Sequence, residues 1–157
     1  MPKISIIIAA RNEEDNLRKL VPMLLSQHYE SFEIIISLDR CSDDSKEVLS
    51  QHDSSKLSYI DITKVPDEWN TKKYALDQGI KTATGEWLVF TDADCLPNSK
   101  NWLKAIVAEI TDHTDIVIGI SPYKTDSSFL SQYVSYESFV TSFLYGSRTL
   151  NKKPYMA

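Results

Sequence analysis

The 157-residue sequence has little glycine and cysteine and no long apolar segment. Its two cysteines, Cys41 and Cys95, lie far apart without flanking cysteine or histidine, which argues against a disulfide framework or a zinc site. We therefore expect reduced thiols and a cytoplasmic protein. The first apolar run, Ile4 to Ala10, is too short to span a membrane or to act as a signal peptide. The formal net charge of −5 argues against a nucleic-acid partner.

Short apolar runs alternate with helical patterns along the whole chain. Ile4–Ala10, Glu33–Leu38 and Trp87–Phe90 are continuous or nearly continuous apolar runs, as in strands covered on both faces. We expect a more exposed strand at Leu57–Thr63 and a last one at Asp115–Ile120. The alternation predicts an α/β fold of Rossmann-like type, with a mainly parallel sheet flanked by helices and the whole chain in one domain.

Polar residues and glycine mark the expected helix boundaries. Asn12 is expected to cap the helix after the first strand, with Asp15 reaching back toward the cap. Gly85 is expected to close a later helix in the left-handed conformation that glycine tolerates. Residues 127–146 carry a broad apolar stripe at helical spacing. Core packing is the favoured role of this stripe, and contact with a membrane or a second subunit is the alternative.

Polar and acidic side chains follow three of the expected strands. Asn12 and Glu13 come after the first strand, Asp39 after the second, and Asp92 and Asp94 after the fourth. In a parallel sheet these strand ends meet at one edge, where α/β proteins bind ligands. Two carboxylates about 4 Å apart repel by roughly 4 kcal/mol at an effective dielectric near 20, so the last pair calls for a counter-charge. Two carboxylates suit Mg²⁺ or Mn²⁺, which fill their coordination shells with water and substrate phosphates.

Several other polar residues have a commoner structural role. Asp43 and Asp44 are of the type that stabilises turns and helix starts. Lys72 could meet a phosphate at a helix N-terminus, although a solvated lysine is the more frequent case. Cys95 has no histidine near it in sequence, which favours a packed thiol over a nucleophile.

Four segments, in this order, resemble the family 2 glycosyltransferases of the GT-A fold: IIAARNEEDNL, EIIISLDRCSDDS, KKYALDQGI and GEWLVFTDADCLPNSKNWL. The resemblance implies transfer of a sugar, with inversion at the anomeric carbon, from a nucleotide diphospho-sugar to a saccharide, lipid or other acceptor. A UDP-sugar is the first expectation for the donor. The resemblance also implies a role in cell-envelope polysaccharide synthesis, in the cytoplasm or on the inner face of the membrane.

The resemblance also implies roles for individual residues around the nucleotide. Ala10, Asn12 and Glu13 would lie near the nucleotide. Asp39 would form a hydrogen bond with the base, and Lys72 would be the basic residue that opens the third helix.

At the metal, Asp92 would lie toward both the ribose and the ion, and Asp94 would bind Mn²⁺ or Mg²⁺ directly. Arg40 and Cys41 stand where the family often has a second acid followed by glycine, which leaves the shape of the base pocket open. Family members continue beyond this length into an acceptor segment that supplies the catalytic base. We therefore expect the chain to stop before that segment and to lack the base.

Three alternatives remain open from the sequence. Phosphatases that form an aspartyl-phosphate also carry an Asp pair, but theirs follows the first strand. Signalling receiver domains gather acids at parallel strand ends, but from the first and third strands. The third alternative is a non-catalytic module that binds a nucleotide or a partner.

Overall fold

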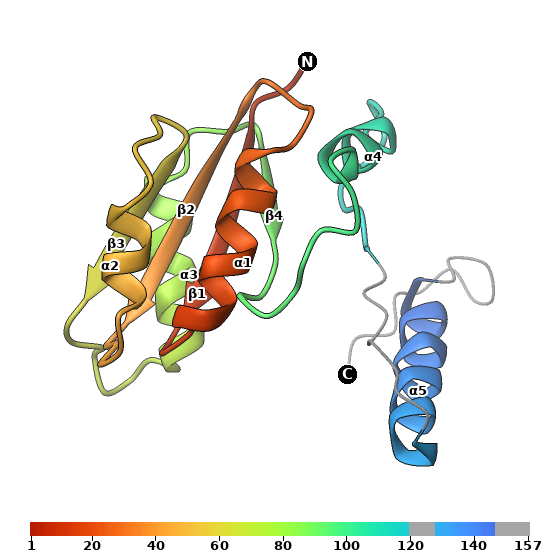
Figure 1. Ribbon diagram of the computed structural model, residues 1–157. Helices are drawn as coiled ribbons and strands as arrows, with labels where there is room; N and C mark the ends of the chain where they lie inside the picture. Colours follow the sequence, from red (N-terminus) through yellow and green to blue (C-terminus); the bar gives the residue numbers. More distant parts are fainter. Residues whose placement is uncertain (120–127, 147–157) are drawn as a thin grey trace. The chain divides into compact units, whose positions relative to one another are not determined.

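The computed structural model describes residues 1–119 and 128–146, and the chain forms two compact units, Met1–Glu109 and Ile110–Ala157. The first unit contains a four-stranded sheet of order β3-β2-β1-β4 in which all neighbouring strands are parallel (Figure 1). Its strands are β1 (Ile4–Ala10), β2 (Phe32–Asp39), β3 (Leu57–Ile62) and β4 (Trp87–Phe90). The expected α/β fold with a parallel sheet is confirmed, whereas the organisation as one domain over residues 1–157 stays a prediction.

The two central strands are β1 and β2, and their sequences explain this position. Every residue of β1 except Ala9 is buried, and every residue of β2 except Glu33 is buried. The strands pair in register, with Ile6 opposite Ile34. Branched isoleucine side chains suit a pleated surface that is covered on both faces.

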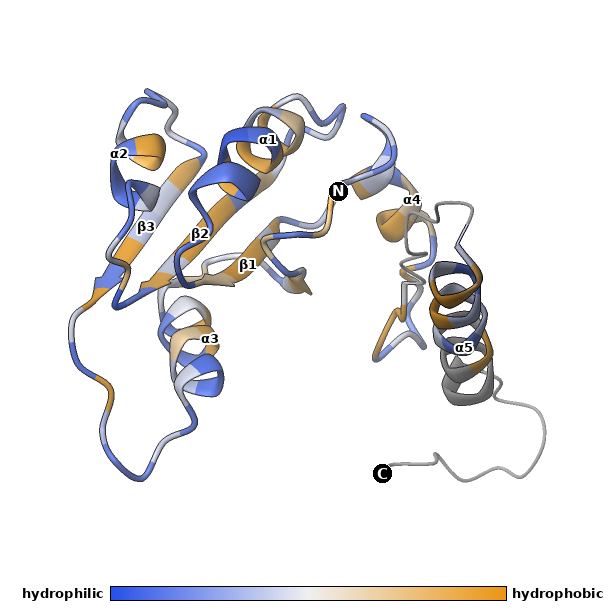
Figure 2. Ribbon diagram, turned by 60° about the horizontal axis from the view of Figure 1, so that its bottom comes forward, coloured by the Kyte–Doolittle hydropathy of each residue, from blue (hydrophilic) through white to orange (hydrophobic). Residues whose placement is uncertain are grey.

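Helices cover both faces of this sheet (Figure 2). α1 (Glu14–Leu25) and α2 (Ser45–Ser50) lie on one face, and α3 (Thr71–Thr82) lies on the other. The buried residues of α1 recur at helical spacing and are Leu17, Leu20, Val21 and Leu24. α3 comes close to the sheet through a residue without a side chain, because a Cβ at Gly79 would lie 2.7 Å from Ile7 Cγ2.

α4 (Trp102–Ala108) is tied to the end of α1 through Gln27. The Gln27 side chain accepts a hydrogen bond from Leu103 N at 3.1 Å and donates one to Ser99 O at 2.9 Å. His28 N adds a bond to Lys100 O at 2.8 Å. These contacts hold the segment that follows β4 against the end of α1.

The expected cap of α1 is wrong. Asn12 has φ 56° and the helix begins two residues later, at Glu14. The amides at the start of α1 are bound instead by residues at the start of α2 and just before it: Glu13 N donates to Ser45 Oγ at 3.1 Å, and Glu14 N donates to Asp43 Oδ2 at 3.0 Å. Sequence spacing cannot reveal a cap that comes from a distant loop.

The role expected for Gly85 is also wrong. α3 ends at Thr82, the residue after it is extended, and no glycine among the described residues has positive φ. Gly85 is needed for a close approach instead, because a Cβ there would lie 2.6 Å from Ser5 N. Its own amide donates to Ser5 Oγ at 2.8 Å.

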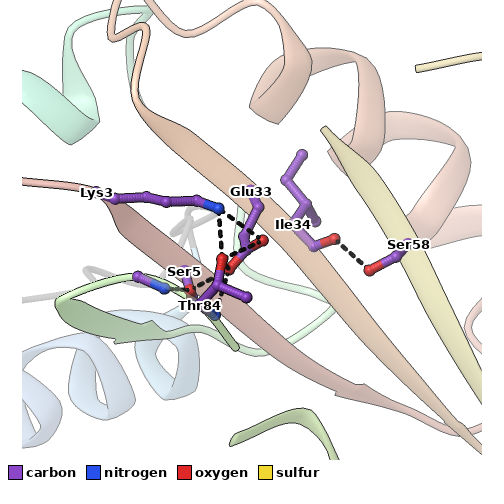
Figure 3. A network of polar contacts seen from close by, with 7 residues as sticks. Lys3, Ser5, Glu33, Ile34, Ser58 and Thr84 are labelled. Carbon is purple, nitrogen blue, oxygen red and sulfur yellow. Dashed lines mark hydrogen bonds and ion pairs between the residues drawn. The ribbon is translucent and has the colours of Figure 1, made fainter. Parts of the chain in front are cut away.

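Glu33 is the centre of a polar network at the amino edge of the sheet (Figure 3). Its carboxylate accepts hydrogen bonds from Ser5 Oγ at 2.6 Å and from Thr84 N at 2.7 Å, and it pairs with Lys3 Nζ at 3.2 Å. Burial alone would raise the pKa of Glu33, but the hydrogen bonds from Ser5, Thr84 and Lys3 outweigh it and lower the pKa to about 2. The network joins the starts of β1 and β2 to the loop before β4.

The second unit corrects one expectation and confirms another. Residues 115–119 form no strand, and the last residue of the expected strand, Ile120, lies outside the described residues. The expected helix is present as α5 (Phe129–Gly146), although residue 127 lies outside the described part of the chain. Four side chains of its apolar stripe are exposed: Phe129, Leu130, Tyr133 and Tyr136. These four do not show the favoured core packing, and contact with a membrane or a subunit stays a prediction.

None of the helices in the described part of the chain combines the length and the apolar character that a membrane span requires.

Candidate functional site

The order in which the strands are added to the sheet reverses at β1. The chain runs from β1 to β2 and β3 on one side and then crosses to β4 on the other side of β1. In parallel α/β sheets, ligands bind beyond the carboxyl ends of the strands at such a switch point. The carboxyl ends of β1, β2 and β4 therefore define where a ligand should lie.

A cleft of about 300 Å³ lies at this position. It is lined by residues from the ends of β1 and β2, from the start of α3 and from the loop after β4. They are Ala9, Ala10, Arg11, Glu13, Asp39, Thr71, Lys72, Ala75, Asp92, Ala93 and Asp94. The structure thus brings together every residue expected at the site except Asn12.

Asn12 supports the cleft from behind its lining. Its side-chain oxygen accepts a hydrogen bond from Ser42 N at 2.8 Å, and its backbone N–H donates to Cys41 Sγ at 3.4 Å. The Cys41 thiol in turn donates to Ala10 O at 3.6 Å. These bonds join the loop after β1 to the loop after β2, so that each loop fixes the position of the other.

Asp43 contributes to the same connection. It accepts hydrogen bonds from Glu14 N at 3.0 Å and from Ser45 N at 3.2 Å. Burial alone would raise the pKa of Asp43, but its hydrogen bonds with Ser45 and Glu14 outweigh this effect and lower the pKa. The structure agrees with a turn-stabilising role for this residue, as expected from the sequence.

Asp39 is the most buried acid of the cleft, with 4% of the residue exposed. Both of its carboxylate oxygens pair with the next residue: Arg40 Nε lies 2.7 Å from Oδ1, and Arg40 Nη2 lies 3.1 Å from Oδ2. The hydrogen bond with Asp39 raises the pKa of Arg40. A buried carboxylate needs such a partner because its desolvation is otherwise costly.

The acids after β4 are more open to solvent. Lys72 Nζ lies 2.7 Å from Asp92 Oδ1, and both side chains are more than half exposed. Asp94 is also exposed, with the Cys95 thiol 3.7 Å from its Oδ1. A lysine therefore supplies a counter-charge to Asp92, whereas the sequence predicts a divalent metal ion in that role.

The acids of the cleft offer a small set of metal ligands. Among the described residues, no group of three or more His, Cys, Asp or Glu could hold an ion. Asp92 and Asp94 both line the cleft and provide carboxylate oxygens. This donor set fits Mg²⁺ or Mn²⁺, which bind one or two carboxylates and take their other ligands from water and phosphate.

The first turn of α3 also opens onto the cleft. Asn70 caps this helix by accepting a hydrogen bond from Lys73 N at 3.2 Å, and Thr71 and Lys72 line the cleft. The amides and dipole at a helix N-terminus favour an anion. A negatively charged group in the cleft would thus meet both this helix end and the Lys72 ammonium.

Five lining residues were not expected from the sequence: Ala9, Arg11, Thr71, Ala75 and Ala93. Arg11 directly follows a buried strand, which is a signal that sequence reasoning could have used. The three alanines carry no chemical signal. They matter because a small side chain leaves space for a ligand, and only the folded structure reveals that space.

The chain resembles known proteins both in sequence and in fold. The profile of the family described as Glycosyl transferase family 2 matches residues 5–156. The chain is 30% identical over 113 residues to the glycosyltransferase AglE of Haloferax volcanii, covering 71% of this chain and 36% of the relative. It is 32% identical over 96 residues to a β-1,3-glucosyltransferase of Campylobacter jejuni that acts on GalNAc(5)-diNAcBac-PP-undecaprenol, covering 60% and 30%.

Among solved structures, the fold resembles a mannosyltransferase of Pyrobaculum calidifontis in complex with GDP-Man and Mn²⁺. The TM-score is 0.64 at 24% identity, over 72% of this chain and 33% of that one. TarS of S. aureus in complex with UDP gives a TM-score of 0.57 at 22% identity, over 68% and 31%. These likenesses establish the GT-A fold. The chain spans about a third of the length of these relatives and structures.

Proposed function

The chain belongs to the family 2 glycosyltransferases, and we propose that its cleft binds the nucleoside diphosphate part of a nucleotide-sugar donor together with a divalent cation. One observation carries this proposal: the cleft at the switch point gathers Asp39, Lys72, Asp92 and Asp94 from three separate parts of the chain. Membership of this family also excludes the two alternatives of a phosphatase and a receiver domain.

The residues of the cleft divide into three roles. Asp39, the buried acid, accepts a hydrogen bond from a nitrogen of the nucleobase. Lys72 and the first turn of α3 bind the diphosphate, because both present positive charge to the cleft. Asp92 lies toward the ribose and the metal, and Asp94 binds the metal directly.

A divalent ion fits these carboxylates. Mn²⁺ or Mg²⁺ held there would stabilise the negative charge that develops on the diphosphate leaving group when the glycosidic bond breaks. Binding of the metal–nucleotide complex would separate Lys72 from Asp92. The lysine would then be available to the phosphate oxygens, which carry more charge than one carboxylate.

The complete reaction is an inverting sugar transfer. Inversion requires a base on the side of the sugar opposite the leaving group, and we assign that base to no described residue. A general base contributes on the order of 10² to 10⁴ in rate. A lipid-linked saccharide is the acceptor we propose, because the Campylobacter jejuni relative is named for one.

Calorimetric titration with nucleoside diphosphates tests the proposal. UDP should bind with Mn²⁺ present, and Asp94→Asn should weaken this binding by about 100-fold because a direct ligand of the ion loses its charge. Without metal, Asp94→Asn should bind UDP as the parent does. The control is Asp53→Asn, which neutralises an exposed acid outside the cleft lining.

Two results would overturn the proposal. One is a parent protein that binds none of UDP, GDP and TDP with Mn²⁺. The other is an Asp94→Asn variant that keeps the parent's affinity for the metal–nucleotide complex, which would place the ion elsewhere.

A further inference from the structure

Arg40 binds the buried acid of the cleft in a specific geometry. Its Nε and Nη2 atoms donate to different oxygens of Asp39, at 2.7 and 3.1 Å. The two bonds run side by side, which is the strong two-point pairing of guanidinium with carboxylate. They occupy the side of the carboxylate that faces away from its Cβ, where both oxygens can be reached at once; we call this the open side. Asp39 therefore has its remaining acceptor positions on the outer sides of those oxygens.

The backbone at Arg40 is held in an unusual conformation that supports this pairing. Its φ is 48°, and Asn12 is the other described non-glycine residue with positive φ. A left-handed backbone is unfavourable for a side chain as large as arginine and persists where the surroundings impose it. Here the Arg40 amide donates to Ile62 O at 2.9 Å, so the turn is fixed at the end of β3.

The occupied side of the carboxylate restricts which nucleobase Asp39 can bind. Guanine offers two adjacent donors, its ring N–H and its exocyclic amine, and pairs best with both oxygens of a carboxylate from their open side. That side is occupied by Arg40. Uracil offers a single ring N–H, which needs only one outer acceptor position.

We propose that Arg40 is a positioning residue that makes the cleft select uracil over guanine by holding Asp39 from its two-oxygen side. The proposal rests on the function proposed above, because it assigns Asp39 to the nucleobase. Arg40 does not line the cleft, so it acts on the base through Asp39. The two solved structures described above carry different nucleotides, GDP-Man and UDP. This fold therefore accommodates either base, and selectivity between them requires a specific residue.

The ratio of UDP to GDP affinity tests this inference. If Arg40 had only a structural role, replacing it would weaken the binding of both nucleotides alike. With Mn²⁺ present, the parent chain should bind UDP about tenfold or more tightly than GDP. Arg40→Met frees the open side of Asp39 and should reduce this ratio by about tenfold, mainly through better GDP binding. Calorimetric titration of both nucleotides gives the ratio directly.

Arg40→Lys separates folding from selectivity. Lysine keeps a positive charge near the buried carboxylate but donates from one point and cannot form the two-point pairing. This variant should keep the parent's thermal stability and still lose most of the preference for UDP. Arg18→Met is the matched control, because it removes an arginine that pairs with Glu14 on α1, away from the cleft lining.

The possible outcomes are distinct. An unchanged UDP to GDP ratio in Arg40→Met and Arg40→Lys, with UDP still bound, would overturn the role of Arg40 alone. A parent chain that prefers GDP would do the same. A parent chain that binds none of UDP, GDP and TDP would overturn the proposed function and this inference together.

Discussion

The two ends of the parallel strands, called here the amino edge and the carboxyl edge of the sheet, differ in how their charged side chains are paired and exposed. At the amino edge, Glu33 receives hydrogen bonds from Ser5 and Thr84 and an ion pair from Lys3, all within the fold. At the carboxyl edge, the Asp92 and Lys72 side chains are more than half exposed and pair with each other. The strands between these edges are the same, so the difference comes from the loops that each edge carries.

This contrast separates stability from binding. A carboxylate with several internal donors is stabilised in its charged form and contributes to folding. An exposed ion pair contributes little to stability, because water solvates its members well and its geometry costs side-chain entropy. The charges of Asp92 and Lys72 therefore remain available to a ligand, and changes at the two edges should have different consequences.

The largest loss of stability should come from Gly85→Ala at the amino edge. The new Cβ would lie 2.6 Å from Ser5 N, so the backbone of β1 or of the loop before β4 would have to shift. Such overpacking costs about 1–3 kcal/mol, and we expect the upper end because the contact is with backbone. Chemical denaturation measures the loss. An unchanged midpoint would show that the loop adjusts freely.

Glu33→Gln should have a smaller effect that depends on pH. The folded pKa of about 2 lies below the usual value of 4.5, so the charged form stabilises the fold fully above pH 4.5. This stabilisation is lost as the pH falls from 4.5 toward 2. Glu33→Gln should lower the free energy of unfolding by about 1–2 kcal/mol at pH 7.

Denaturation curves between pH 7 and pH 3 check this prediction. The difference between parent and Glu33→Gln should shrink as the solution becomes more acidic. A difference that stays constant with pH would mean that the charge of Glu33 is not what stabilises the network.

The smallest effects should distinguish two lysines, one at each edge. Lys3→Met removes the ion pair with Glu33 and should cost up to about 1 kcal/mol of stability while leaving UDP affinity unchanged. Lys72→Met should change stability by less than about 0.5 kcal/mol and should weaken UDP binding by about threefold to tenfold without metal. Equal effects of both substitutions on UDP affinity would contradict the division between the edges.

The strands and most of the site were predictable from the sequence for a common reason. Strands buried on both faces are continuous apolar runs, so Ile4–Ala10 was predicted with the bounds that the structure shows. The bounds of Trp87–Phe90 are also as predicted, but its expected burial on both faces is wrong, because Leu88 and Phe90 of this outer strand are exposed. Because these strands are parallel, the acids that follow them meet at one edge. Asp39, Asp92 and Asp94 were identified on this basis, and all three line the cleft.

The errors arose where a structural role depends on residues distant in sequence. The cap of α1 comes from Asp43 and Ser45, about thirty residues away, so the local pattern at Asn12 was misleading. Gly85 is required by the approach of Ser5, which appears only when β1 and β4 pair. The pairing of Arg40 with the adjacent Asp39 was not predicted either, because it accompanies a left-handed backbone that is uncommon for arginine.

Mn²⁺ with UDP provides the most direct test of the central claim that the carboxyl edge binds the metal–nucleotide complex. The two edges are separated by the seven residues of β1, which span about 20 Å at roughly 3.3 Å per residue. In an amide NMR spectrum, paramagnetic Mn²⁺ broadens nearby signals most strongly. With UDP present, the Ala10 and Ala93 amides should lose intensity, while Ser5 and Thr84 should keep theirs. Broadening centred on Ser5 and Thr84, or spread evenly over both edges, would contradict the account.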